Sequence, residues 1–171
     1  LESRHRTYQK IHLIGHSRGG GMAILAAQQW QQVSPLGQVC TWAAICDIAR
    51  RFPKDDELKQ WKETGVRFVK NGRTLQDLPQ FFELYANFER NKARLDIKAA
   101  AKEIGKRLHI FHGDLDTSVP ISEAYELQEV SDAKVIEIHG ADHVFGAVHP
   151  WDQDVLPPLL EELCGKTLRE L

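Results

Sequence analysis

The sequence predicts an α/β fold built around a parallel sheet. Apolar runs typical of strands alternate with segments of helical periodicity, an alternation that favours a parallel sheet covered on both faces. The expected strands are residues 10–14, 38–44, 108–111 and 134–138. The run 38–44 contains no charged residue, as is typical of a strand buried on both faces.

The expected helices lie between and after these strands. One extends from the glycines after Ser17 to about residue 32, another covers 122–130, and the last begins near Pro157. Proline is tolerated in the first turn of a helix because its missing N–H would have no partner there. The apolar face of the last helix is expected to carry Leu159, Leu160, Leu163 and Leu168.

The turn after the first strand has the pattern G-x-S-x-G, formed by Gly15-His16-Ser17-Arg18-Gly19. A strand, a tight turn and a helix together are the context of a nucleophile elbow, which exposes a serine hydroxyl at the end of a strand. Glycines are expected on both sides of Ser17 because side chains there would collide with the strand or the helix. The pattern also occurs by chance, and the alternative is that Ser17 only caps the helix.

Composition excludes several classes of function. The 171 residues are 42% apolar and 27% charged with a net charge of −2, so no nucleic-acid partner is expected. No apolar run approaches the roughly 20 residues that span a bilayer. The three cysteines, Cys40, Cys46 and Cys164, form no C-x-x-C pair and are expected to be buried free thiols. They favour a reducing, cytoplasmic location.

Residues 47–105 interrupt the alternation of strands and helices. We expect a single domain over residues 1–171, incomplete at its N-terminus, with 47–105 as a lid-like insertion. Within it, 57–64 is expected to be helical, and Asn71-Gly72 between two short runs predicts a hairpin over 66–75. Asp77-Leu-Pro-Gln80 has the pattern of a helix start, and Asp96 can cap a second short helix that ends at Gly105.

The insertion is rich in aromatic residues. A stripe at helical spacing comprises Phe81, Leu84, Tyr85, Phe88 and Leu95. Phe68, Phe81, Phe82, Tyr85 and Phe88 either shape a substrate pocket or pack the insertion onto the body, and the sequence leaves both interpretations open.

Candidate partners for Ser17 follow later strands. A serine hydroxyl needs a base to accept its proton and a carboxylate to hold that base in the correct tautomer. The loop after 108–111 offers Asp114 and Asp116, and the loop after 134–138 offers His139 and His143. Because sites in parallel sheets lie at the carboxyl ends of the strands, these loops and the elbow are expected at one edge of the sheet.

Three motifs in this order resemble the α/β-hydrolase superfamily, over about residues 5–171. They are the elbow, the stretch His112-Gly113-x-x-Asp116-x-x-Val119-Pro120, and Gly140-Ala141-x-His143 followed by Val144-Phe145. The chain looks closest to the small esterases and peptidases of the dienelactone-hydrolase and prolyl-oligopeptidase-like group. The resemblance implies Ser17 as nucleophile, Asp116 as acid and His143 as base. It also implies that the backbone N–H of Arg18 forms one half of an oxyanion hole.

The other polar residues of these loops are expected to have structural roles. Asp114 is expected to cap a turn and accept backbone hydrogen bonds, and Asp142 to be solvated. His139 and His149 are expected to lie in loops or on the surface. His16 and His112 are expected to orient backbone, and the alternative is that they line the site. The Arg18 side chain either pairs with a neighbouring carboxylate or meets an anionic group of the substrate.

The leading hypothesis is therefore a serine hydrolase that cleaves a small carboxylic ester through an acyl-enzyme, without metal or organic cofactor. The alternatives are a serine peptidase of the prolyl-oligopeptidase type, acting on short peptides, and a non-catalytic binding domain. The chain begins at Leu1, and Met22 is its only methionine. We expect an upstream segment that supplies the second oxyanion donor and pairs with the strand 10–14, so the 171 residues alone are expected to be inactive and poorly soluble.

Overall fold

The computed structural model describes residues 9–30, 32, 35–72 and 74–171. The chain divides into two compact units. The first comprises Leu1–Cys46 and Ile97–Leu171, and the second comprises Asp47–Asp96. The second unit thus ends before residues 97–105, which the sequence analysis assigned to the insertion. The reason is packing, since Ile97 lies against the helix after Ser17. A Cβ added to Gly21 of that helix would lie 2.6 Å from the Ile97 Cδ1.

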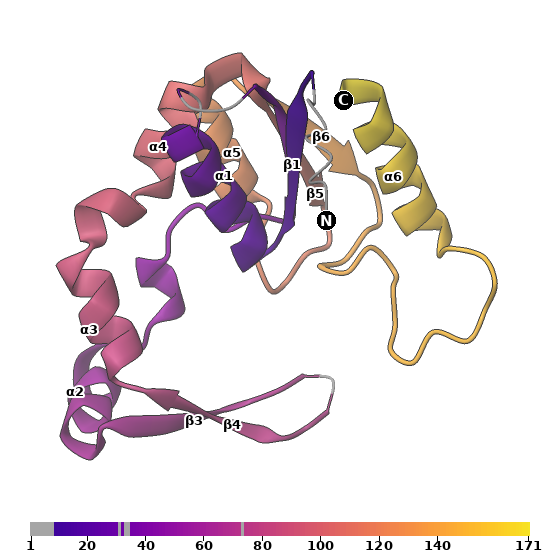
Figure 1. Cartoon of the computed structure of the whole chain (residues 1–171). Coiled ribbons are helices and arrows are strands. Elements are labelled where there is room, and N and C mark those ends of the chain that lie inside the picture. Colours follow the sequence, from indigo (N-terminus) through magenta and orange to yellow (C-terminus); the bar gives the residue numbers. More distant parts are fainter. Residues whose placement is uncertain (1–8, 31, 33–34, 73) are drawn as a thin grey trace, which may run out of the picture. The chain divides into compact units, whose positions relative to one another are not determined.

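The first unit contains a parallel sheet, as the sequence predicted. Its described strands lie in the order β1-β2-β5-β6, and every neighbouring pair is parallel (Figure 1). The bounds are β1 Ile11–His16, β2 Leu36–Trp42, β5 Leu108–Gly113 and β6 Lys134–Ile138. The carboxyl ends of all four strands therefore meet at one edge, where the elbow and the two polar loops also begin.

Helices cover both faces of this sheet. Three lie together on one side, namely α1 Arg18–Trp30, α4 Ile97–Ile104 and α5 Ser122–Ser131 (Figure 1). Along the chain, the 3₁₀ turn Gly105–Arg107 and β5 lie between α4 and α5. Helix α6, Pro158–Glu170, lies on the other side. Burial on both sides explains why Val39, Cys40 and Thr41 of β2 are all fully buried.

A core cluster fills the space between the sheet and α6. Its fully buried members are Cys40, Ala43, Phe111, Ile138, Ala141, Phe145 and Leu163, and Leu159 and Leu160 pack against it. Leu168 was wrongly assigned to this face, because 72% of it is exposed. Thr167 is buried in its place, and its Oγ1 accepts a hydrogen bond from the Trp42 indole at 3.0 Å.

The second unit combines short helices with a two-stranded ribbon. Its elements are the 3₁₀ turn Ala49–Arg51, α2 Asp55–Thr64, β3 Val66–Lys70, β4 Asp77–Phe81, α3 Glu83–Arg90 and the 3₁₀ turn Lys92–Leu95. A hairpin is present, with β3 and β4 antiparallel, but its second strand is Asp77–Phe81 and lies beyond the predicted range 66–75. The helix start predicted at Asp77–Gln80 is wrong. Those residues form β4, where Asp77 pairs with Lys70 and Leu78 with Val69.

The aromatic residues of the second unit fall into two groups. Phe52, Trp61, Phe82, Tyr85 and Phe88 pack against one another, with ring centroids 5.1–6.4 Å apart. Phe68 and Phe81 are 65% and 64% exposed and lie on the same face of the ribbon, because Phe68 pairs with Pro79 and Phe81 with Val66. The first group is therefore the core of this unit, and the second is an exposed apolar face.

Two further observations bear on the sequence predictions. None of the three cysteines forms a disulfide within the described residues, and Cys40 and Cys46 are buried, whereas Cys164 is half-buried. None of the helices in the described part of the chain combines the length and the apolar character needed to span a bilayer.

Candidate active site

Ser17 lies at a sharp turn between β1 and α1. Its φ angle is 56°, in the left-handed region that costs a non-glycine residue roughly 1–2 kcal/mol. The backbone of neighbouring segments holds it there. Its N–H donates to the carbonyl of Trp42 at 2.8 Å, and its carbonyl accepts from the N–H of Ile45 at 3.3 Å. Such an over-determined strained residue is typical of a functional position.

Close packing at the elbow depends on two glycines, and only one of them is in the predicted pair. A Cβ on Gly15 would lie 2.3 Å from the carbonyl oxygen of Gly19, and one on Gly20 would lie 2.6 Å from the Ala44 Cβ. A Cβ on Gly19 would meet nothing within 4 Å. The expectation of a steric requirement on both sides of Ser17 is thus wrong for Gly19, and Gly20 takes its place.

Asp116 is a buried carboxylate in the loop after β5, with 7% of its surface exposed. Its Oδ1 accepts hydrogen bonds from the backbone N–H groups of Ser118 at 2.8 Å and Val119 at 2.9 Å. Its Oδ2 lies 2.7 Å from Nδ1 of His143. A carboxylate fixed by two backbone donors has a defined direction, and here that direction is the His143 imidazole.

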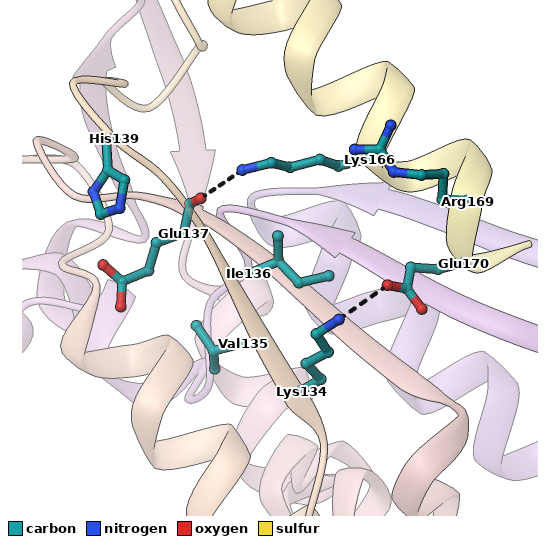
Figure 2. Close-up of a pocket in the computed structure, with 8 residues that line it drawn as sticks. All are labelled: Lys134, Val135, Ile136, Glu137, His139, Lys166, Arg169 and Glu170. Carbon is teal, nitrogen blue, oxygen red and sulfur yellow. Dashed lines mark hydrogen bonds and ion pairs between the residues drawn. The ribbon is translucent and has the colours of Figure 1, made fainter.

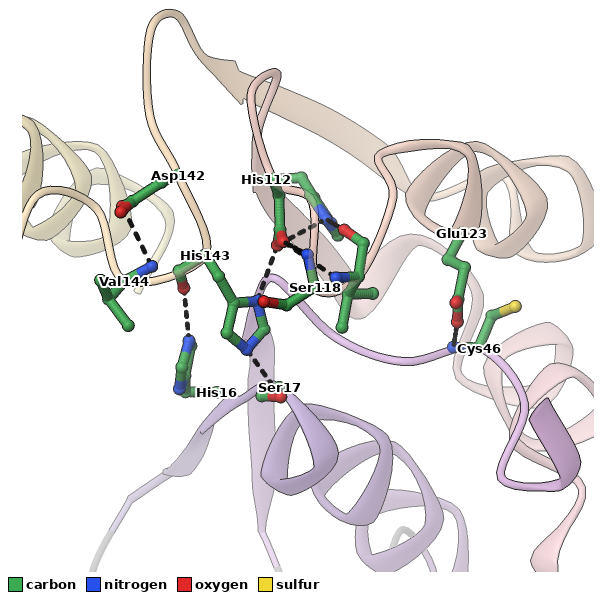
Figure 3. Close-up of polar contacts among 11 residues, drawn as sticks. His16, Ser17, Cys46, His112, Ser118, Glu123, Asp142, His143 and Val144 are labelled. Atoms are coloured by element: carbon green, nitrogen blue, oxygen red, sulfur yellow. Dashed lines mark hydrogen bonds and ion pairs between the residues drawn. The ribbon is translucent and has the colours of Figure 1, made fainter. Parts of the chain in front are cut away.

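His143 lies between Asp116 and Ser17, with its Nε2 at 3.0 Å from Ser17 Oγ (Figure 3). The carboxylate beside Nδ1 fixes the proton on that nitrogen, which leaves Nε2 free to accept from the serine hydroxyl. The structure thus brings the three residues expected to form the triad into one hydrogen-bonded line. Such a line can transfer a proton from the serine to the imidazole.

Two further histidines hold the backbone around this line. His16 Nε2 lies 2.8 Å from the carbonyl oxygen of His143, to which it donates a hydrogen bond (Figure 3). His112 is fully buried and donates from Nε2 to the carbonyl of Val119 at 2.8 Å, with Asp116 Oδ2 at 3.3 Å. Burial lowers the pKa of His112, although Val119 and Asp116 oppose the shift. The expected backbone-orienting contacts are thus present for both.

The alternative carboxylates and the loop histidine make other contacts. Asp114 Oδ1 accepts from the Gly140 N–H at 2.6 Å, and its Oδ2 lies 3.3 Å from Nδ1 of His139, whose side chain is 80% exposed. Asp142 is exposed and accepts from the N–H groups of Val144 and Gly146 at 3.2 and 2.9 Å. His149 is also exposed. None of these side chains reaches Ser17 in the described structure.

Arg18 is the first residue of α1, so its backbone N–H has no acceptor within the helix. That N–H lies at the positive end of the helix dipole, next to the serine, where it suits a developing oxyanion. The Arg18 side chain is exposed and forms no ion pair within the described residues. The expected pairing with a neighbouring carboxylate is therefore not present there.

Glu123 is a supporting residue that the sequence did not single out. It is 3% exposed, and its Oε2 accepts from the N–H of Cys46 at 2.8 Å (Figure 3). This bond anchors the segment after β2 whose Ile45 N–H binds the Ser17 carbonyl. A glutamate in the first turn of a helix is ordinary, so nothing in the sequence distinguishes this one.

A cavity of about 450 Å³ lies away from this chemistry, along β6 and the last turns of α6 (Figure 2). Two lysines make contacts across this cavity. Lys134 lies 3.3 Å from the Glu170 carboxylate, and Lys166 donates to the backbone carbonyl of Glu137 at 3.2 Å. Neither Ser17, Asp116 nor His143 lines it. Within the described residues, no group of three or more His, Cys, Asp or Glu side chains has the geometry of a metal site.

Comparison with known proteins identifies the fold. A putative hydrolase from Agrobacterium vitis S4 superposes with a TM-score of 0.69 at 18% identity, covering 95% of this chain and 61% of that one. An alpha/beta hydrolase enzyme from the metagenome of lagoon sediments at Mar Chica, Morocco, gives 0.53 at 17% identity, over 95% and 63%. The chain has the α/β-hydrolase fold.

A monoacylglycerol lipase from Paleococcus ferrophilus shares this α/β-hydrolase fold, with a TM-score of 0.60 and 18% identity over 94% of this chain and 67% of that one. The chain thus spans about three fifths to two thirds of the length of these solved structures. No protein-family profile matches the sequence, and no curated protein sequence matches it.

Proposed function

We propose that this α/β-hydrolase chain carries the catalytic residues of a serine hydrolase that cleaves a small carboxylic ester. The observation that carries the proposal is the continuous line from Asp116 through His143 to Ser17, with distances of 2.7 and 3.0 Å. Its residues come from three loops at one edge of a parallel sheet, where sites in such folds are found.

In the proposed reaction the Ser17 hydroxyl donates its proton to His143 Nε2 as its oxygen attacks the ester carbonyl. Asp116 stabilises the resulting imidazolium through the bond at Nδ1. The Arg18 N–H donates to the oxyanion of the tetrahedral intermediate. His143 then returns the proton to the leaving alcohol, which leaves an acyl group on Ser17. A water molecule repeats these steps and releases the acid.

Similar solved structures favour an ester as the substrate. They include the lipase from Paleococcus ferrophilus and an esterase domain from Rhodothermus marinus. The same triad chemistry would cleave a peptide bond, as the resemblance to prolyl-oligopeptidase-like enzymes implies. A panel of p-nitrophenyl esters and aminoacyl p-nitroanilides distinguishes these two substrate classes.

Labelling with a fluorophosphonate probe tests the proposal. The natural protein should react at Ser17, and Ser17→Ala should not react. Ser122→Ala, which changes an exposed serine at the start of α5, is the matched control and should label normally. A natural protein that is folded but resists the probe, and hydrolyses no ester on the panel, would instead support a non-catalytic binding domain.

A further inference from the structure

We propose that Asp114 is a positioning residue that acts through His143, by fastening the loop that carries the base to the loop that carries the acid. This inference rests on the proposed function, because it concerns the same triad. Asp114 itself touches neither Ser17 nor His143 in the described structure, so its effect on turnover would be transmitted through the backbone.

The two loops begin where the sheet ends. The register of β5 and β6 pairs Gly113 with Ile138, the last residue of β6. Beyond that pair the backbone contacts continue, from the N–H of Asp114 to the Ile138 carbonyl at 3.5 Å and from the N–H of Leu115 to the Ala141 carbonyl at 3.0 Å. The first of these is at the limit of hydrogen-bond length, so the backbone holds the two loops weakly at Asp114, whereas the second bond has an ordinary length.

The Asp114 side chain supplies the stronger connection at this point. Its Oδ1 accepts from the Gly140 N–H at 2.6 Å, which is a short, charge-assisted hydrogen bond. Its Oδ2 lies 3.3 Å from His139 Nδ1. Hydrogen bonding to Gly140 and to His139 lowers the pKa of this carboxyl, while its desolvation opposes the shift. The group therefore remains an ionised acceptor for the Gly140 N–H at neutral pH.

The contact between Asp114 and Gly140 lies in the turn that precedes His143. Gly140 has a φ of 77°, in the left-handed region, so the chain reverses there, three residues before His143. The two loops are also in close contact beside it, because a Cβ on Gly113 would lie 2.2 Å from the Ala141 carbonyl oxygen. A loop released at Gly140 would let His143 shift relative to Asp116, and a misplacement of about 1 Å can cost about 100-fold in rate.

Kinetics of Asp114→Ala in the natural protein test the proposal. We expect kcat to fall roughly 10- to 100-fold with KM nearly unchanged, because the base moves while the substrate surface does not. Asp114→Asn keeps an oxygen acceptor for the Gly140 N–H and should recover most of the loss. Glu137→Gln is the matched control, because that carboxylate accepts from Tyr125 at 2.7 Å and does not bind the loop.

A double variant separates positioning from plain stabilisation. In a His143→Ala background, Asp114→Ala should cause no further loss of the residual rate, since the residue through which it acts is absent. The amide of Gly140 should also exchange its hydrogen faster in Asp114→Ala, a readout that requires no activity.

Two outcomes would overturn different statements. An active parent protein, together with an Asp114→Ala variant that has a lower melting temperature but an unchanged kcat per folded molecule, would show that Asp114 is only structural. A folded parent protein that hydrolyses nothing would overturn the proposed function instead. If, in that inactive protein, the Gly140 amide exchanged its hydrogen at the same rate with and without Asp114→Ala, Asp114 would not hold the two loops together.

Discussion

His143 Nε2 lies 3.0 Å from Ser17 Oγ, although 126 residues separate the two along the chain. The distance is short enough for direct proton transfer in the resting structure, without a bridging water or a loop movement. The Asp116 carboxylate is equally well placed on the opposite side of the imidazole. Asp116 should therefore be far more important for turnover than Asp114, the other carboxylate of the loop after β5.

Asp116→Asn should reduce kcat by about 10⁴-fold, because an amide beside Nδ1 favours the wrong tautomer of His143. Asp114→Asn should cost much less, since the Gly140 N–H keeps an acceptor. Steady-state kinetics of both variants on one p-nitrophenyl ester measure the two effects. The reverse order of losses would mean that the acid has been assigned to the wrong carboxylate.

Gly15→Ala and Gly19→Ala should have opposite effects on the free energy of unfolding, although both glycines belong to the G-x-S-x-G pattern. The added Cβ at residue 15 would lie 2.3 Å from a carbonyl oxygen, whereas that at residue 19 would lie in open space within α1. We expect Gly15→Ala to unfold or strongly destabilise the first unit. Gly19→Ala should raise the free energy of unfolding by about 0.5–1 kcal/mol. Melting temperatures measured by calorimetry test both, and equal losses would contradict the elbow geometry.

Phe88→Ala and Phe81→Ala should separate stability from substrate choice. Phe88 is 6% exposed and packs on Phe52, so its truncation should cost about 3–5 kcal/mol. Phe81 is 64% exposed, and its truncation should change stability by less than about 0.5 kcal/mol. If the insertion selects substrates, Phe81→Ala should change the ratio of long-chain to short-chain ester hydrolysis. A constant ratio would place the acyl pocket elsewhere.

Acid should destabilise the first unit through His112. Burial lowers the pKa of this imidazole in the folded protein below 6.5, the value expected once it is unfolded. The unfolded chain then binds more protons between those two pKa values, so the free energy of unfolding falls as the pH drops below about 6.5. Thermal melts at about pH 7.5 and pH 5.5 should show this loss, and His112→Gln should reduce it.

In His112→Gln, the free energy of unfolding should still depend on pH because of His109. Burial lowers its pKa as well, with Glu170 opposing the shift and Lys134 adding to it. Adding His109→Gln should therefore flatten the profile further. If His112→Gln left the slope between the two pH values unchanged, the buried imidazole of His112 would not be its source.

Much of the first unit could be predicted from the sequence because its signals are local. Four apolar runs gave the four strands of the described sheet, and the Ser, Asp, His order named the residues that the structure brings together. The triad roles themselves stay predictions until the variants are measured. Contacts such as Asp114 with Gly140, or Glu123 with Cys46, had no local signal because they join distant segments.

The second unit was harder to predict, for a specific physical reason. Asp77-Leu-Pro-Gln80 satisfies the chemistry of a helix start, yet pairing with Val66–Lys70 makes it a strand. Tertiary context overrides local preference there, and only the register of the ribbon reveals it. Phe81 is the last residue of this strand and is exposed, whereas Phe82, just beyond the strand, packs in the core.

The order of the strands has a consequence for folding experiments. Ser17 follows β1 at one edge of the described sheet, and His143 follows β6 at the other. Their contact forms only when β2 and β5 are in register between them, so it is among the most non-local contacts in the chain. Reaction of Ser17 with an activity probe would therefore report the completed sheet. In a refolding time course, probe reactivity should appear after helix content, with the last kinetic phase.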